Sequence, residues 1–354
     1  MEEKRNSPFF SVIVLAYQVE AFISECLNSI LLQTFQDMEI IVVIPACNDK
    51  TESICEKYKL KDNRIQLIKK ENEGQLLNRL AGFGIAKGKY LLCIDGDDWW
   101  KANLLEEIYK ASERGSFDLI MFGYETVTAD RVLNQQFHIL QDGHVYKGKE
   151  KEIVYEMLVQ EKINSIWTKA MTQEVFIRIK EDFSKYTSIR YGEDLLYCLY
   201  IIDEAKNILY MDQLLYCYRK REDSVVHTFS PRELEDKKIV ILHVEKMMKK
   251  WNMTSAYYYE MLYKTVALFF MKFIFRCSTS NLSLVQKKNL LDAIRTDSLY
   301  LKSRNYQNKG PDFLKERFFV WLFRRSDILV LLSGSIYCIG KQSKNILKHI
   351  KEGF

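Results

Sequence analysis

Four short apolar runs alternate with segments of helical periodicity over the first 95 residues. The runs have the length of β-strands and lie at residues 10–15, 39–44, 65–69 and 90–94. The segments between them carry apolar side chains on one face, as amphipathic helices do, and lie at residues 22–32, 51–58 and 75–86. This alternation is typical of βαβ units, whose strands pair in parallel through right-handed crossovers. The sequence therefore predicts an α/β fold.

The fourth run leads directly into a group of carboxylates. Residues 90–94 are followed by Asp95, Asp97 and Asp98 within four positions. Ligands of open α/β sheets bind beyond the carboxyl ends of the strands. Oxygen ligands there suit Mg²⁺ or Mn²⁺, which usually binds together with substrate phosphates. The alternative is an acidic turn that caps the next helix, with Asp98 or Asn103 as the N-cap.

The composition describes a globular protein and excludes several classes. The chain has 354 residues, 47% hydrophobic and 28% charged, which allows two domains or one large domain with an appendage. None of the strand-to-helix turns has a G-x-G-x-x-G or Walker pattern, so dinucleotide and P-loop sites have no support. The eight cysteines form no C-x-x-C pair, which indicates reduced, buried thiols rather than disulfides or a zinc site.

Positive charge is concentrated at the C-terminal end. Residues 313–354 contain eight Lys and Arg against three Asp and Glu, which accounts for the whole net charge of +5. A neutral body with a basic, apolar tail favours a membrane surface over a nucleic-acid partner. The first residues show no secretory signal pattern. We therefore expect a cytoplasmic chain that is peripheral at the inner face of the membrane.

Several short motifs occur in the order and spacing of a known family. In the first half they are Tyr17, Ser29-x-x-x-Gln33-Thr34, the series Asn72, Gly74, Arg79, Gly82, Ala86 and Gly88, and Asp95-Gly-Asp97-Asp98. In the second half they are Trp167-Thr-Lys169, Glu193-Asp194 and Tyr218-Arg219. Together they resemble the family 2 glycosyltransferases of bacterial surface-polysaccharide type, over residues 9–229. The resemblance implies a GT-A fold, with a doubly wound, mostly parallel, Rossmann-like sheet.

This resemblance suggests a division of the chain. Residues 1–229 would form the GT-A domain, with a nucleotide-binding half at 9–98 and an acceptor half at 99–229. Residues 230–354 would form a helical, basic, membrane-associating region.

In this C-terminal region, helical patterns lie at residues 233–251, 256–277 and 283–300, and the apolar run at 328–340 is too short to cross a bilayer. Residues 313–325 and 343–350 mix aromatic and basic side chains, as interfacial helices do. A helical cap on the catalytic domain or a dimer contact is the alternative.

The resemblance assigns catalytic roles to the acidic residues. Asp97 would bind the metal, and Asp95 would face the ribose or a metal-bound water. A divalent ion that bridges the diphosphate stabilises the charge that develops on the leaving group. Asp194 would be the general base that takes the proton of the acceptor hydroxyl, with Glu193 in support. At the start of a helix, Asp194 would also stabilise the helix dipole.

Four further residues are candidates on the same grounds. Tyr17 would stack on the nucleobase, Asp49 and Arg79 would bind the nucleotide, and His227 would be a second metal ligand. The simpler interpretations are a strand-end aromatic for Tyr17, a solvated helix charge for Arg79 and a structural histidine for His227. Three tryptophans could form the floor of the acceptor site or pack in the core, namely Trp99, Trp100 and Trp167.

The sequence departs from the family after the second strand. The family usually has Asp-Asp-Gly-Ser there, with an Asp that binds the uracil ring, whereas this chain has Ile-Pro-Ala-Cys at residues 44–47. Pro45 has neither a side-chain acceptor nor a backbone N–H. The family's Arg-Asn pair is Arg79-Leu80 here. The resemblance therefore implies where the diphosphate binds but leaves recognition of the base open.

The sequence thus predicts an inverting glycosyltransferase. It would move one sugar from a nucleotide-diphosphate sugar, a UDP-sugar, to a hydroxyl of a glycan or lipid-linked glycan, with Mn²⁺ or Mg²⁺. One rival is a sugar nucleotidyltransferase, which needs a Gly-rich phosphate loop that residues 16–20 do not provide. The other is a non-catalytic binding protein, favoured by the loss at residues 44–47 and opposed by the retained acidic residues Asp95, Asp97, Glu193 and Asp194.

Overall fold

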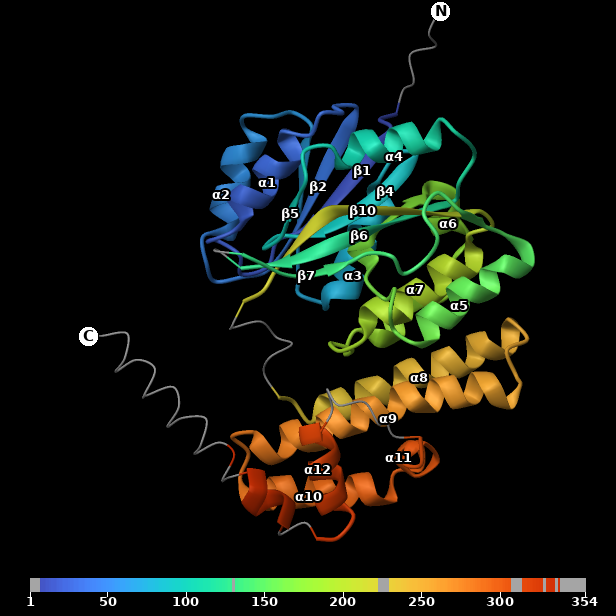
Figure 1. Ribbon diagram of the computed structural model, residues 1–354. Helices are drawn as coiled ribbons and strands as arrows, with labels where there is room; N and C mark the ends of the chain where they lie inside the picture. Colours follow the sequence, from blue (N-terminus) through green and yellow to red (C-terminus); the bar gives the residue numbers. More distant parts are fainter. Residues whose placement is uncertain are drawn as a thin grey trace, which may run out of the picture. The chain divides into compact units, whose positions relative to one another are not determined.

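The computed structural model describes residues 7–128, 131–221, 229–306, 314–326, 329–334 and 337. The chain divides into two compact units (Figure 1). The first contains residues 1–224 and 239–251, and the second contains residues 225–238 and 252–354.

Four parallel strands form the first half of the sheet. They are β1 (Phe10–Leu15), β2 (Met38–Pro45), β3 (Ile65–Lys70) and β4 (Tyr90–Asp95), and they lie in the order β3-β2-β1-β4. Every residue of β1 and β2 is buried, as expected for parallel strands covered on both faces. Each strand lies within one residue of its predicted bounds, so the βαβ interpretation is confirmed.

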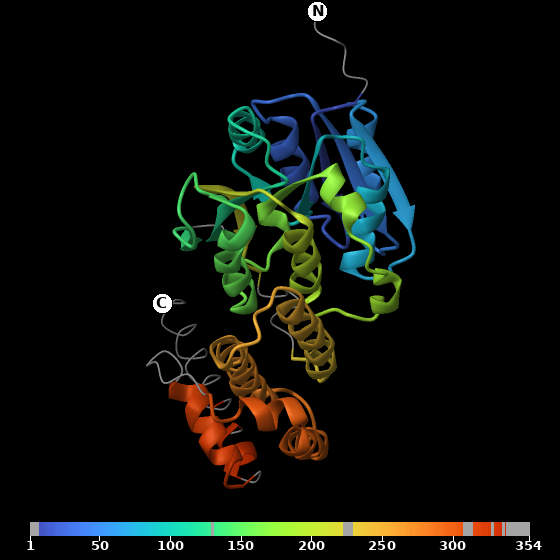
Figure 2. The ribbon, with the colours of Figure 1, turned by 90° about the vertical axis from the view of Figure 1, so that its right-hand side faces the viewer.

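The helices between these strands cover both faces of the sheet. They are α1 (Ile23–Leu31), α2 (Thr51–Lys59) and α3 (Gln75–Ile85). The strand order reverses after β3, because β4 pairs with β1 on the side away from β2. Figures 1 and 2 accordingly show α1 and α2 on one face of the sheet and α3 on the other. The carboxyl ends of β1 and β4 thus form a topological switch point, where α/β folds bind ligands.

The sheet continues beyond β4 with mixed strand directions. The further strands are β9 (Lys169–Thr172), β6 (Leu119–Val127), β10 (Ile208–Arg219) and β5 (Trp99–Trp100), with β7 (Val132–Gln136) on β6 and β8 (Val145–Tyr146) on β10. Strand β9 runs antiparallel to both β4 and β6, and β6 runs parallel to β10. The α/β fold class with a GT-A-type sheet is therefore confirmed.

The remaining helices of the first unit support the second half of the sheet. They are α4 (Leu104–Ser112), α5 (Lys151–Val159), α6 (Gln173–Arg178) and α7 (Glu193–Glu204). Three short 3₁₀ turns accompany them, η1 (Gly148–Glu150), η2 (Ile166–Thr168) and η3 (Phe183–Tyr186). Turn η2 leads directly into β9, which lies next to β4 in the sheet.

The described residues beyond 229 form helices and no strand, as predicted. Helix α8 (Arg232–Lys250) contributes residues to both units. In the second unit, α9 (Ala256–Thr279) packs with α10 (Leu284–Thr296), α11 (Ser298–Ser303) and α12 (Leu314–Phe323). Along α9, buried apolar residues recur at helical spacing, including Leu262, Val266, Phe270, Ile274 and Cys277. No helix in the described residues is both long and apolar enough to cross a membrane.

The single helix predicted at residues 283–300 is wrong. The structure has two helices there, α10 (Leu284–Thr296) and α11 (Ser298–Ser303). Asp297 separates them because its backbone is extended and its side chain accepts hydrogen bonds from the N–H groups of Leu299 and Tyr300, at 2.9 and 3.1 Å. A side-chain N-cap of this kind starts a new helix rather than continuing the old one.

Candidate active site

The acidic turn after β4 depends on a close approach between two backbones. The N–H of Gly96 donates to the carbonyl of Leu15, the last residue of β1, at 2.8 Å. A Cβ atom at position 96 would lie 2.7 Å from the same oxygen, so a side chain does not fit there. Asp95, Asp97 and Asp98 follow one another around this turn, and their side chains have different partners.

Asp98 is a structural residue. It is buried, and its two carboxylate oxygens accept hydrogen bonds from the Tyr216 hydroxyl at 2.5 Å and the Arg219 N–H at 2.7 Å. Burial raises the pKa of Asp98 well above its usual value, and the charges of Asp97 and Asp95 act in the same direction. Asp98 caps no helix, because α4 begins after Asn103, whose side chain makes no capping hydrogen bond. Of the two predicted N-caps, Asp98 is therefore wrong, and Asn103 occupies the N-cap position of α4 without a side-chain hydrogen bond.

Asp97 is the acidic side chain of the turn that fits a metal. Arg221 donates to one of its carboxylate oxygens at 3.1 Å. Burial raises the pKa of Asp97, as does Asp95, although Arg221 lowers it. Within the described ranges, no group of three His, Cys, Asp or Glu side chains could hold an ion. One carboxylate with substrate phosphates is a usual arrangement for Mg²⁺, so this donor set fits a substrate-bound ion.

Arg79 joins the two halves of the site. It comes from α3, is 1% exposed, and donates to Asp95 at 2.8 Å and to Asp194 at 2.5 Å. Its Nη2 atom also lies 3.4 Å from the side-chain oxygen of Gln75. Arg79 is thus not a solvated helix charge. It connects the end of β4 with the start of α7.

Asp194 and Glu193 lie in the first turn of α7. Gly192 precedes them in a left-handed conformation, with φ 87°. The side chain of Asp194 is 22% exposed, so a solute can reach it beside the buried Arg79. Burial raises the pKa of Asp194, although Arg79 acts in the opposite direction. Burial and the neighbouring Asp194 raise the pKa of Glu193 to about 8, so Glu193 is mainly protonated at neutral pH.

Tyr17 and Asp49 lie in the loops that follow β1 and β2. Tyr17 is 43% exposed, which leaves its ring available for stacking. Asp49 accepts hydrogen bonds from the hydroxyl of Thr51 at 2.8 Å and from the N–H groups of Thr51 and Glu20, both at 3.1 Å. Burial raises the pKa of Asp49, but these hydrogen bonds outweigh it and the net shift is downward. Asp49 therefore fixes the loop that carries Tyr17.

Sequence reasoning assigned no role to two arginines at and just beyond the end of β10, Arg219 and Arg221. The Nε of Arg219 donates to the backbone carbonyl of Asp97 at 2.7 Å, and its guanidinium lies 4.4 Å from the centre of the Trp99 ring. Arg221 contacts the Asp97 carboxylate and lies 4.8 Å from the centre of the Phe22 ring. The available signal was two arginines, with one residue between them, where a long and mostly buried strand ends. Both cations lie beside the turn where a diphosphate would bind.

The tryptophans are mostly packing residues. Trp100 is buried in β5, and Trp167 is buried against Tyr216 and Tyr218, with ring centres 4.4 and 5.7 Å away. Trp99 is partly exposed, with Arg219 on its face. The predicted metal ligand His227 lies outside the described residues.

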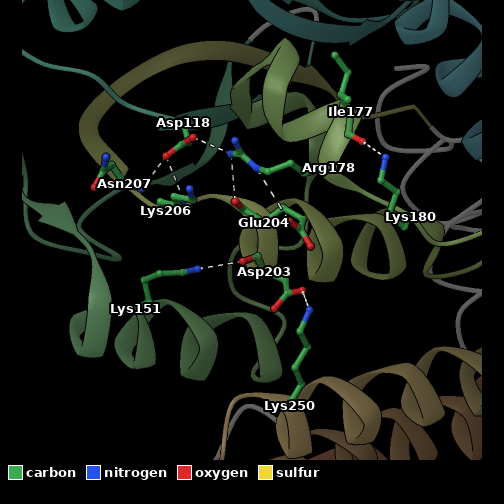
Figure 3. Close-up of polar contacts among 10 residues, drawn as sticks. All are labelled: Asp118, Lys151, Ile177, Arg178, Lys180, Asp203, Glu204, Lys206, Asn207 and Lys250. Carbon is green, nitrogen blue, oxygen red and sulfur yellow. Dashed lines mark hydrogen bonds and ion pairs between the residues drawn. The ribbon is translucent and has the colours of Figure 1, made fainter.

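Helix α7 is held at its far end by a second polar cluster (Figure 3). The buried Lys151 donates to the backbone carbonyl of Asp203 at 3.1 Å, and the Asp203 carboxylate pairs with Lys250 at 2.5 Å. Nearby, Asp118 pairs with Arg178 at 2.7 Å. These contacts fix the end of α7 opposite Asp194.

Sequence comparisons show what the first unit is similar to. Residues 11–179 match the model described as Glycosyl transferase family 2. This match covers the strands, helices and acidic turn of the candidate site's first half. Glycosyltransferase GlyA of Streptococcus pneumoniae serotype 4 is 28% identical over 63% of this chain and 32% of its own length. The uncharacterized glycosyltransferase EpsJ of Bacillus subtilis strain 168 is 30% identical over 62% of this chain and 63% of its own. The chain thus spans less than two thirds of either relative.

Solved structures support the fold. S. aureus TarS 1–349 has a TM-score of 0.61 at 19% identity, over 94% of this chain and 91% of that one. The same TarS fragment in complex with UDP-GlcNAc has a TM-score of 0.54, also at 19% identity, over 85% and 93% of the two chains. At this identity the likeness shows the fold, and the family resemblance seen in the sequence is confirmed.

Proposed function

We propose that this chain transfers one sugar, with inversion, from a nucleoside-diphosphate sugar to an acceptor hydroxyl. The observation that carries the proposal is the contact of one buried guanidinium, that of Arg79, with Asp95 and Asp194. It brings the carboxyl end of β4 and the first turn of α7 to one point. A donor bound at the switch point would then present its anomeric carbon near Asp194.

The donor site would lie over the ends of β1 and β4. The carboxylate of Asp97 would hold a divalent ion, which would supply Lewis-acid stabilisation of the charge on the diphosphate. Arg219 and Arg221 would add positive charge beside the leaving group, and Tyr17 would stack on the base. The complex of TarS with UDP-GlcNAc supports a UDP-sugar as the donor.

Asp194 would act as the general base. Its partial exposure allows an acceptor hydroxyl to reach it, and a carboxylate can take the proton as the oxygen attacks. Glu193, protonated at neutral pH, would not compete for that proton. It would keep the pair of carboxyl groups at a single negative charge.

The acceptor would be a glycan or a lipid-linked glycan at the inner face of the cytoplasmic membrane. Residues 313–354 carry the excess positive charge of the chain. On α12, Phe318 and Trp321 are about half exposed and stack with ring centres 6.1 Å apart, and Arg325 lies 4.3 Å from the centre of the Trp321 ring. Aromatic and basic side chains together suit the surface of an anionic bilayer.

The test is turnover of a panel of UDP-, GDP- and dTDP-sugars with Mn²⁺, read as release of the nucleoside diphosphate. Wild type should turn over one donor, and Asp194→Asn should lower kcat by about 100-fold or more, since general bases contribute that much. Donor affinity should change less than about twofold, because Asp194 acts on the acceptor. Donor binding without turnover would favour the non-catalytic binding protein. The presence of Pro45 where the family usually has an Asp also favours that alternative.

A further inference from the structure

We propose that Lys169 is a positioning residue for Asp194: its ammonium group shapes the turn that packs against the first turn of α7 and supplies positive charge behind the carboxylate. The inference rests on the proposed function, in which Asp194 is the base. Lys169 is the first residue of β9, the strand next to β4 in the sheet.

Lys169 is a buried cation that binds backbone rather than an acidic side chain. Its Nζ donates to the carbonyls of Ile163 at 2.7 Å and Ser165 at 2.6 Å. Within the described residues, no Asp or Glu lies within ion-pair distance of it. A buried ammonium is costly unless hydrogen bonds and a counter-charge compensate it. The two carbonyls supply the hydrogen bonds, so the counter-charge must lie further away.

The turn that Lys169 holds is the one that faces Asp194. The carbonyls of Ile163 and Ser165 flank Asn164, whose own carbonyl accepts from the thiol of Cys198, a residue of α7 one turn after Asp194, at 3.3 Å. Turn η2 follows and packs against α7. Its first residue, Ile166, directs its N–H to the Asp194 carboxylate and favours the ionised form. Lys169 thus shapes the backbone that presents this N–H.

The charges of the cluster balance when Lys169 is counted. Arg79, Asp95, Glu193 and Lys169 come from α3, β4, α7 and β9, and each acts electrostatically on Asp194 or its neighbour. With Glu193 protonated, two cations face two carboxylates. Arg79 is shared between Asp95 and Asp194, so Lys169 is the second positive charge that the base requires. Cys198 is also near, and burial raises the pKa of its thiol to about 11, so the thiol adds no charge at neutral pH.

The kinetic test compares Lys169→Met with Lys151→Met in the full chain. Lys151 is the matched control, because it too is a buried lysine that donates to a backbone carbonyl, but at the far end of α7. Removal of Lys169 disfavours ionised Asp194, so the acid limb of the kcat profile should move to higher pH. If the pKa of Asp194 rises by one unit, kcat on that limb falls about tenfold, and kcat recovers at higher pH. The KM for the donor should stay within about twofold.

The Lys151→Met control separates a general loss of stability from an effect on Asp194. Lys151→Met should lower thermal stability and leave the pH profile in place. The proposal would be overturned if the pH profile of kcat is unchanged in Lys169→Met and kcat falls only in proportion to thermal stability, as in the control. If Lys169→Met does not fold, Lys169→Gln, which keeps a donor for one carbonyl, takes its place. Failure of both to fold would make Lys169 a purely structural residue and would also overturn the proposal.

A second readout needs no turnover and so separates this inference from the proposed function. The loss of Tm on Lys169→Met is measured in the wild type and in Asp194→Asn, as a double-mutant cycle. If Lys169 acts on Asp194, the loss should be smaller in the Asp194→Asn background. Equal losses would exclude the coupling even if the enzyme is active. A clear coupling in a chain without turnover would uphold the pairing and contradict only the glycosyl transfer.

Discussion

The hydroxyl of Tyr216 donates a 2.5 Å hydrogen bond to Asp98, which ties strand β10 to the acidic turn after β4. The same hydroxyl lies 3.4 Å from the backbone N–H of Asp95. One buried phenol thus holds the turn that carries Asp97 against the strand that ends at Arg219 and leads to Arg221. The geometry of the donor site depends on a contact between residues 118 positions apart.

Removal of this hydroxyl should destabilise the protein. Tyr216→Phe leaves a buried carboxyl group without one of its two partners, which costs about 1–3 kcal/mol. Thermal unfolding checks this. The matched control is Tyr197→Phe, because Tyr197 is equally buried and its hydroxyl has no hydrogen-bond partner in the described residues. A Tm loss as large in the control as in Tyr216→Phe would show that the Asp98 contact contributes nothing.

Asp97 should make nucleotide binding depend on metal. A nucleoside diphosphate with Mn²⁺ at about 100 times Kd should stabilise the wild type by about 2.7 kcal/mol. Asp97→Asn should lose the part of this stabilisation that requires Mn²⁺. Asp98→Asn is a poor substitute as a control because Asp98 is structural, so the wild type with chelator serves instead. An undiminished Mn²⁺ effect in Asp97→Asn would place the ion elsewhere.

Glu193 should make stability depend on pH. Its pKa of about 8 in the folded chain lies above the ordinary value of 4.5, so the folded state binds the proton more tightly than the unfolded state. Its contribution is complete below about pH 4.5 and is lost as pH rises toward 8. Glu193→Gln removes this dependence, so its Tm relative to wild type should rise between pH 5 and pH 8. A constant difference across that range would contradict the assignment.

The aromatic pair on α12 should bind anionic membranes. The double substitution of Phe318 and Trp321 by Ser should reduce binding to phosphatidylglycerol vesicles by about tenfold, since each half-exposed ring contributes apolar area. Substitution of Leu284 and Val285, which are 62% and 69% exposed on α10, is the matched control. Equal binding by the two double variants would exclude α12 from the membrane contact. Binding of the wild type to neutral vesicles as strong as to phosphatidylglycerol vesicles would exclude it too.

The sequence predicted the strands β1 to β4 well because their signal is local, whereas it gave no bounds for the later strands. Continuous apolar runs such as residues 10–15 and 90–94 allow few structures other than buried parallel strands. The burial of Arg79 was also accessible, since Leu76, Arg79 and Phe83 share one face of α3. The alternative of a solvated helix charge followed from residue type alone, and the spacing argues against it.

The roles within the acidic turn could not be read from the sequence. Three carboxylates in four positions look equivalent, and Asp98 is distinguished from Asp97 by Tyr216 and Arg219, more than 115 residues later in the chain. The break between α10 and α11 was missed for a different reason. Asp297 has the residue type of an N-cap, but the apolar spacing continues across it and suggested one helix.

The most direct measurement of the central claim is donor turnover by the wild type and by Asp194→Asn, at matched donor occupancy with Mn²⁺. We predict release of nucleoside diphosphate from one sugar nucleotide by the wild type, lowered about 100-fold or more in Asp194→Asn. We further predict a product whose anomeric configuration is opposite to that of the donor. Equal release by the two proteins, or a product with retained configuration, would contradict Asp194 as the base of an inverting transfer.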